Sequence, residues 1–246
     1  DEAFEARQPF AGPVERQLFL EEAVTQTIAS WRQPPVQVEA RPAWEEVEEP
    51  NPFSQASPGM MVQFAVFGLI GAGSVLVMER QSGALQRLLT TPVTRAQVIA
   101  GHLLGAFLVV FLQEVILVLL GQLAFGVDYL RQPLATLLVV LGLALFSTAL
   151  GMLIGAISKG QEQVIMWTLI AMFILSAMGG AWFPLRETGS AFSTMGHLLP
   201  TAWAMDGLQN IVLRGLGLQS VLVPTGILLL YAAALFGLAV WRFRFE

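Results

Sequence analysis

Residues 79–95 read ERQSGALQRLLTTPVTR, a charged and turn-rich stretch between two apolar runs that are each long enough to cross a bilayer. Ser82 can cap a short helix whose leucines recur at spacings of three and four and therefore share one face. Pro92 ends this helix, because a proline biases the preceding residue toward an extended backbone. The leucines are Leu85, Leu88 and Leu89. The pattern predicts a short amphipathic helix that lies along the membrane surface between two spans.

The next helix has a recognisable start. Thr94 is followed three residues later by Gln97, which is the spacing of a capping box. From the residues alone, two interpretations of the stretch stay open. It is either a solvated connector, held on the cytoplasmic side by its three arginines, or a docking surface for a partner.

Composition places the chain in a membrane. Hydrophobic residues make up 55% of its 246 residues, charged residues only 13%, and the mean hydropathy is +0.65. Ordinary soluble domains carry about 25% charged residues. Five apolar runs reach the ~20 residues that a helix needs to span a bilayer. We therefore predict an all-α integral membrane protein with spans at about 58–78, 98–125, 134–157, 164–183 and 218–241, in a transmembrane domain of residues 58–246.

Residues 1–57 have a different character. Residues 1–50 hold eleven acidic residues and four arginines, whereas the remaining residues hold seven acids and nine lysines plus arginines. The segment has too few large apolar side chains to hold a core alone. We expect it to be an extracytoplasmic segment of a larger domain. The opening DEAFEARQPF, which has no initiator Met, also suggests the middle of a longer protein.

Basic residues in the loops set the orientation. One alternate set of loops holds most of them: Arg80, Arg87, Arg95, Lys159, Arg242 and Arg244. The other set holds Arg131, Arg186 and Arg214. Because cytoplasmic loops are enriched in Lys and Arg, residues 79–95 and the C-terminus are expected in the cytoplasm and the N-terminal segment outside.

Residues 184–217 are too polar to cross the membrane. We predict two short helices dipping into the outer leaflet, with Thr201 capping the second one, over residues 202–214. Asp206, Asn210 and Arg214 recur every four residues on this helix as a polar stripe. The alternative is an ordinary folded outer loop.

Glu114 is an ionisable residue well inside an apolar run, and Gln113 precedes it. At 1.5 Å per residue from about His102, it lies roughly 18 Å deep in a core of ~30 Å. A carboxylate at that depth is costly unless it is protonated, paired or wetted. Gln113 and Glu114 are therefore candidate pathway residues. The alternative is a protonated Glu114 that is hydrogen-bonded to a neighbouring helix.

Paired small residues predict close helix contacts within or between subunits. They are Gly101 with Gly105, and Gly151 with Gly155. His102 and His197 fall near opposite ends of the membrane region, so we expect each to be satisfied locally rather than to share a metal.

Several classes of function lack their motifs. The chain has no G-x-x-x-x-G-K-[ST] phosphate loop, no H-E-x-x-H and no cysteine, so ATP binding by that loop, that zinc site and disulfides are excluded. Its charge pattern does not suggest a nucleic-acid surface. Ser74 in GAGSV faintly matches a serine nucleophile motif, which leaves an intramembrane hydrolase as an alternative.

The run from Pro58 to Gly105 closely resembles the membrane subunits of ABC type-2 exporters. In that family a Glu-Arg pair, a Gly four positions after the Glu, a Leu-rich turn and Thr-Pro followed by Arg mark the cytoplasmic coupling helix, which contacts the ATPase. The corresponding residues here are Glu79, Arg80, Gly83, Leu88, Leu89, Thr91, Pro92 and Arg95. Arg87, on the polar side of the same helix, completes the candidate coupling set.

The resemblance implies a multi-pass permease of the cell membrane that works as a homo- or heterodimer with separate ATPase subunits. ATP and Mg²⁺ would bind the partner ATPase, and this chain would have no enzyme activity and no cofactor of its own. Relatives usually have six spans, so the first span is expected to be missing here. The substrate stays open. A membrane scaffold or receptor without transport is the alternative function.

Overall fold

The computed structural model describes residues 12–32, 51–83 and 94–242. The chain divides into two compact units, Asp1–Glu48 and Glu49–Glu246. In the first unit, α2 (Pro13–Arg32) is a single helix with Glu15 in its first turn and with exposed Leu18, Leu20 and Val24. The expectation that this segment belongs to a larger extracytoplasmic domain stays a prediction.

The second unit contains the membrane region. Its long helices are α3 (Phe53–Phe67), α4 (Leu69–Gln81), α6 (Arg95–Phe125), α7 (Pro133–Ile157), α8 (Gln161–Met178) and α11 (Gln219–Arg242). Together α3 and α4 form one apolar segment, so five segments of the described residues are long and apolar enough to span a membrane. The five predicted spans are thus confirmed.

The first and fourth spans differ from the prediction by three residues or more at each end. The first span begins at Phe53 rather than residue 58, and Gly68 separates it into α3 and α4. The fourth span ends at Met178 rather than residue 183, because the chain turns at Gly180, whose φ of +81° favours glycine. The sequence stays apolar beyond this turn, so a prediction based on hydropathy alone placed the end of the fourth span too late in the chain.

The start of α6 matches the predicted capping box. The Gln97 amide donates to the Thr94 hydroxyl at 3.3 Å, and the Gln97 side-chain oxygen accepts from the Thr94 amide at 2.8 Å. The helix ends at Phe125, where Gly126 takes a left-handed conformation with φ of +63°.

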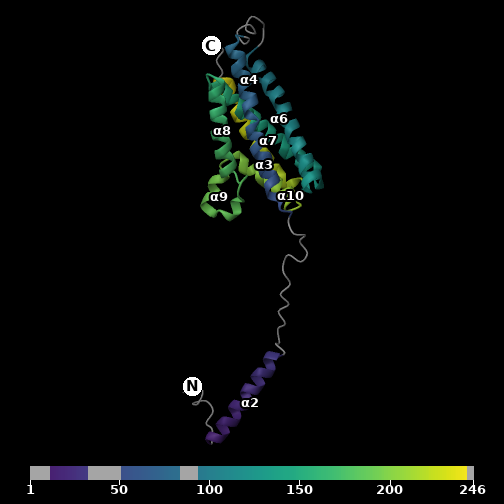
Figure 1. Cartoon of the computed structure of the whole chain (residues 1–246), viewed down its shortest axis with the longest axis vertical. Coiled ribbons are helices and arrows are strands. Elements are labelled where there is room, and N and C mark those ends of the chain that lie inside the picture. Colours follow the sequence, from purple (N-terminus) through teal and green to yellow (C-terminus); the bar gives the residue numbers. More distant parts are fainter. Residues whose placement is uncertain (1–11, 33–50, 84–93, 243–246) are drawn as a thin grey trace. The chain divides into compact units, whose positions relative to one another are not determined.

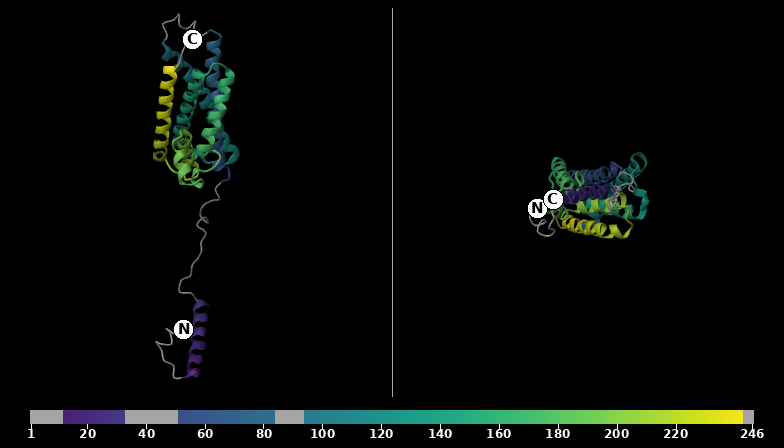
Figure 2. Two further views of the ribbon diagram at one scale, coloured as in Figure 1. Left: turned by 90° about the vertical axis from the view of Figure 1, so that its left-hand side faces the viewer. Right: turned by 90° about the horizontal axis from the view of Figure 1, so that it is seen from below.

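Helix α7 lies in the middle of the bundle and contacts α4, α6, α10 and α11. Figure 2 shows the bundle from the side and from one end, with α11 in yellow. Gly151 and Gly155 of α7 face α4 closely: a Cβ on Gly155 would lie 2.8 Å from the Gly73 carbonyl oxygen. The predicted small-residue contact at Gly151 and Gly155 is therefore confirmed within the chain.

Gly101 and Gly105 behave differently. A Cβ on either of them would meet no described atom within 4 Å. Both line a cavity of about 680 Å³ between α4 and α6 that is also bordered by Gly68, Gly71 and Val109. The prediction that this pair packs between helices therefore has no support within the described chain.

The segment between α8 and α11 holds α9 (Ser190–Gly196) and α10 (Pro200–Val212). They lie at the end of the bundle opposite to the end of α4 (Figure 1). The predicted Thr201 cap is wrong, because α10 starts at Pro200 and the Thr201 hydroxyl donates to the Leu175 carbonyl at 2.7 Å. Proline fits the first turn, where its missing N–H costs no hydrogen bond.

Helix α10 is largely buried. Ala204, Leu208 and Ile211 pack into the main core, and the helix contacts α3, α7 and α11. One of the two short helices is therefore covered by other helices. The placement of both in the outer leaflet stays a prediction.

Candidate functional site

The predicted coupling residues fall into two groups. Arg87, Leu88, Leu89, Thr91 and Pro92 lie outside the described residues, as does most of the predicted amphipathic helix. Arg95 begins α6, and nothing further is described of its side chain. Glu79 and Arg80 lie in the last turn of α4, and Gly83 lies in the turn that follows it.

Arg80 holds the end of α4 against the end of α7. Its guanidinium donates to the Ser158 carbonyl at 3.0 Å and to the Ala156 carbonyl at 3.3 Å. These carbonyls belong to the last turn and the C-cap of α7, where backbone acceptors lack partners within the helix and carry partial negative charge. A guanidinium matches that site in both hydrogen bonding and charge.

The residues on either side of Arg80 extend these links. Glu79 on α4 accepts from the His102 imidazole on α6 at 2.6 Å. Gln81 donates to the Lys159 carbonyl at 3.3 Å, in the loop between α7 and α8. Three consecutive side chains thus join α4 to α6 and to the end of α7.

The turn that follows α4 is built by Ser82 and Gly83. The Ser82 hydroxyl donates to the Glu79 carbonyl at 3.1 Å. This hydrogen bond satisfies an acceptor in the last turn of α4, so Ser82 contributes to the end of that helix. Gly83 has φ of +69°, and its amide donates to the Arg80 carbonyl at 3.2 Å. A left-handed residue at this position ends a helix at little cost when it is glycine.

Glu114 is fully buried, and neither of its carboxyl oxygens has a hydrogen-bond partner among the described residues. Gln113 donates to the Phe64 carbonyl on α3 at 3.0 Å. Tyr129 is close to Glu114 and shares a 2.8 Å hydrogen bond with Ser57. Burial raises the pKa of Tyr129, and the nearby Glu114 carboxyl adds to that rise. The pathway role of Gln113 and Glu114 stays a prediction.

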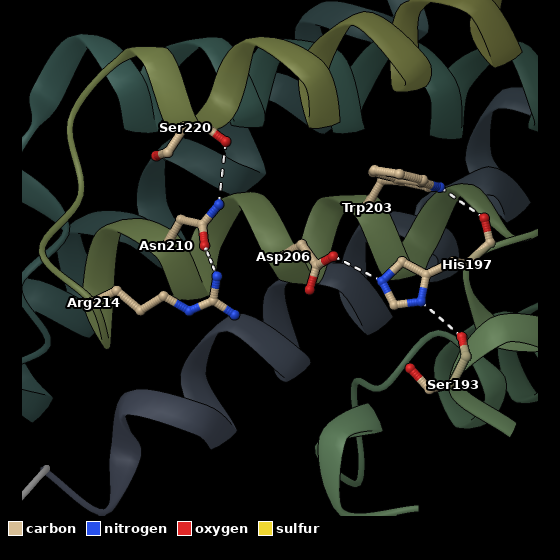
Figure 3. Close-up of polar contacts among 7 residues, drawn as sticks. All are labelled: Ser193, His197, Trp203, Asp206, Asn210, Arg214 and Ser220. Atoms are coloured by element: carbon tan, nitrogen blue, oxygen red, sulfur yellow. Dashed lines mark hydrogen bonds and ion pairs between the residues drawn. The ribbon is translucent and has the colours of Figure 1, made fainter. Parts of the chain in front are cut away.

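A second polar cluster, which sequence reasoning missed, joins α9 to α10 (Figure 3). The His197 ring lies between two acceptors: Nδ1 is 2.7 Å from the Ser193 carbonyl oxygen and Nε2 is 2.8 Å from an Asp206 oxygen. A carbonyl and a carboxylate can only accept, so a doubly protonated ring satisfies both contacts. Trp203 donates to the His197 carbonyl at 2.8 Å and fixes the same turn.

The predicted polar stripe on α10 does not act as one unit. Asp206 pairs with His197, whereas Arg214 donates to the Asn210 side chain and Asn210 donates to the Ser220 carbonyl. Asp206 and Asn210 lie on α10 as their spacing predicted, but α10 ends at Val212 and Arg214 lies in the turn beyond it. The spacing gave no sign of His197, which lies in the turn after α9.

The surroundings of His197 predict a dependence of stability on pH. Burial alone would lower the pKa of His197, but the hydrogen bonds to Ser193 and Asp206 and the charge of Asp206 raise it overall. A raised pKa stabilises the fold below pH ~6.5, and that stabilisation is lost as the pH rises through the pKa of the folded state. We expect this stabilisation to be worth about 0.2–1 kcal/mol, the range measured for solvent-accessible ion pairs.

The measurement is thermal unfolding of the detergent-solubilised chain between about pH 6 and pH 9, a range that begins near the ordinary pKa of histidine. The midpoint should fall with rising pH in the parent and change less in His197→Gln. Asp206→Asn should flatten the profile in the same way. Equal pH profiles in the parent and His197→Gln would contradict the assignment.

The two described histidines therefore serve local contacts, His102 with Glu79 and His197 with Asp206. Neither contact involves Ser74, so the geometry gives no support to a serine hydrolase. Among the described residues, no group of three or more His, Cys, Asp or Glu side chains is placed to hold a metal ion.

Comparison with known proteins gives consistent matches. Residues 20–241 match the family model described as ABC-2 family transporter protein. The linearmycin resistance permease protein LnrN of Bacillus subtilis is 27% identical over 196 residues, which cover 80% of this chain and 51% of LnrN. The probable multidrug ABC transporter permease YbhS of Escherichia coli is 27% identical over 187 residues, covering 75% of this chain and 49% of YbhS.

A eukaryotic protein matches a smaller share of the chain at the same identity. The ABC transporter G family member 20 of Dictyostelium discoideum is 27% identical over 164 residues, covering 66% of this chain and 22% of that protein. No solved structure matches the chain significantly. The chain thus spans about half the length, 51% and 49%, of the two bacterial permeases described above.

Proposed function

The chain belongs to the ABC-2 family of transporter proteins, and from this we propose that it is a membrane-spanning permease subunit of an ATP-driven exporter. It would work as a dimer of permease subunits in the cell membrane, with ATP and Mg²⁺ bound by separate ATPase subunits. The N-terminal segment would lie outside and the C-terminus in the cytoplasm, as the distribution of basic residues indicates.

The observation that best supports this proposal is the set of links at the end of α4. Arg80 contacts the carbonyls that end α7, and Glu79 contacts His102 on α6. A force applied to the chain just after Gly83 would therefore act on three membrane helices at once. A plain connector would not need such links on both sides of one helix end.

The proposed mechanism divides the work between chains. The ATPase subunits close on ATP, and the segment from Ser82 to Thr90 passes that motion to α4. Through Glu79 and Arg80, the ends of α6 and α7 then follow α4, and the membrane helices rearrange a path at the interface between permease subunits. Coupled motion of this kind needs packed elements with two discrete arrangements.

The test is co-purification with an ATPase subunit, followed by ATP turnover measured with and without this chain. Replacing Leu88 and Leu89 with Ser, or Arg87 with Glu, should leave membrane insertion unchanged and reduce ATPase association or stimulation at least ~10-fold, because the loss falls on a surface contact. Normal association and normal transport in these variants would favour the plain connector. Failure of any ATPase to associate with the parent chain would instead favour a scaffold or receptor.

A further inference from the structure

The polar cluster between α9 and α10 surrounds a hollow. A cavity of about 250 Å³ lies there, and most of its lining is polar or charged. The lining residues are Leu185, Ser193, His197, Met205, Asp206, Gln209 and Arg214. The volume is smaller than that of the usual drug-sized pocket of ~300–1,000 Å³, and it suits a single polar group.

The charges around this cavity do not balance. Asp206 is paired with the His197 imidazole at 2.8 Å, so its charge is offset when the ring is protonated. Arg214 lies within ion-pair distance of no carboxylate among the described residues. It donates only to the neutral side chain of Asn210 there, which in turn is anchored to the Ser220 carbonyl. A positioned guanidinium therefore remains without a counter-charge.

A second arginine meets the same edge of the bundle. Gly215 lies in the turn after α10 with a left-handed φ of +61°, and a Cβ there would lie 2.9 Å from the guanidinium carbon of Arg131. Arg131, which ends the 3₁₀ turn η1 (Tyr129–Arg131), thus packs over the residue that follows Arg214. It too lacks an ion-pair partner in the described chain. Both arginine side chains are exposed, so two positive charges on this edge of the bundle are open to an anion.

Exposed leucines lie close to the two arginines along the chain. The exposed leucines within four positions of them include Leu130, Leu213, Leu216 and Leu218. The outward side of α9 is apolar as well, with Phe192 and Met195 exposed while Ser193 and His197 line the cavity. Basic groups set in exposed apolar surface at the end of a transmembrane bundle suit a molecule with an anionic head and apolar tails.

We propose that Arg131 and Arg214, together with the α9–α10 cavity, bind the phosphate of an anionic phospholipid headgroup, whose acyl chains run along the neighbouring leucines. Guanidinium groups are suited to this role because their planar donors match phosphate oxygens in pairs. Gly215 allows the two arginines to approach one edge, since any side chain there would displace Arg131. The proposed lipid site does not require ATP-driven transport, so it can be confirmed or refuted independently of the proposed transport function.

The proposal is tested by native mass spectrometry of the full chain in detergent, titrated with phosphatidylglycerol. Arg214→Gln and Arg131→Gln should each weaken binding about tenfold, the loss expected for one charged hydrogen-bonding group, and the double variant should weaken it further. Arg242→Gln, at the opposite end of the bundle, is the matched control and should bind like the parent. Arg214→Lys, which keeps the charge without the planar fork, should fall between the parent and Arg214→Gln.

Two further ligands test whether the site recognises the lipid headgroup, the acyl chains or free phosphate. Uncharged diacylglycerol should bind at least ~10-fold more weakly than phosphatidylglycerol, and inorganic phosphate should not displace the lipid at equal concentration. Equal binding of diacylglycerol, or displacement by inorganic phosphate, would overturn a lipid headgroup site. Parent-like lipid binding in the double arginine variant would overturn the role of the arginines. Unfolding midpoints measured without lipid show whether each variant is folded. If Arg214→Gln is not folded, lipid binding by Arg214→Lys is used to test the proposal.

Discussion

Replacing Gly155 with Val is expected to separate α4 from α7 and to lower the free energy of unfolding by about 3 kcal/mol, at the upper end of the cost of overpacking a well-packed interface. A Cβ at this position would lie 2.8 Å from the carbonyl oxygen and 2.9 Å from the Cα of Gly73. Both atoms are backbone, so no change of side-chain rotamer can relieve the contact. The two helices must move apart along their whole interface.

Gly101→Val is the matched control. It makes the same chemical change in another helix of the bundle, but a Cβ at Gly101 meets no described atom within 4 Å. Thermal unfolding in detergent, followed by tryptophan fluorescence, should therefore show a large fall in the midpoint for Gly155→Val and little change for Gly101→Val. Equal midpoints in the two variants would show that α4 and α7 do not approach each other as closely as described.

Arg80→Gln is expected to have the second largest effect, on coupling as well as on stability. It removes the charged donors to the Ala156 and Ser158 carbonyls at the end of α7. Hydrogen bonds to charged groups are worth ~1.5–3 kcal/mol each, and we expect about 2 kcal/mol of lost stability because the site is partly open to water. If the chain couples to an ATPase, stimulation of ATP turnover should fall much more than insertion does.

Lys159→Gln provides the control for Arg80→Gln. Lys159 lies in the same region and its side chain is exposed, while its backbone carbonyl accepts from Gln81. The control therefore removes a cation from the same surface and leaves the backbone contacts in place. If Lys159→Gln reduced ATP turnover as strongly as Arg80→Gln, surface charge rather than the helix link would explain the effect.

Much of the fold followed from the sequence because its signals were local. Span length and apolar composition located five membrane segments, and Thr94 with Gln97 located the start of α6. The close approach at Gly151 and Gly155 followed from their four-residue spacing. Each of these signals depends on residues that are near one another in the chain.

The features that sequence reasoning missed depend on contacts between distant residues. Thr201 is a residue type that commonly caps helices, yet α10 already begins at Pro200. The Thr201 hydroxyl instead donates to the Leu175 carbonyl on α8. His197 lies in the turn after α9 and Asp206 lies on α10, so periodicity on one helix could not pair them. Arg131 reaches Gly215 across more than eighty positions of sequence, and no spacing rule predicts that contact.

The candidate site was predicted in part. The position of Glu79 and Arg80 at the end of a span followed from the pattern of apolar and charged residues. Their partners did not, because His102 and the end of α7 lie on helices that meet α4 only after folding. Sequence reasoning could name the charged residues of this turn, but it could not identify the acceptors they contact.

The central position of α7 has a consequence for the order in which the protein is assembled in the membrane. A Cβ on Gly142 of α7 would lie 3.3 Å from the Leu228 side chain of α11, so a helix that is synthesised well after α7 packs closely on it. Until α11 has left the ribosome and entered the bilayer, that side of α7 can be covered only by lipid or by another protein. Chains that stop after α10 should therefore insert but remain loosely packed, and become targets for membrane quality-control proteases.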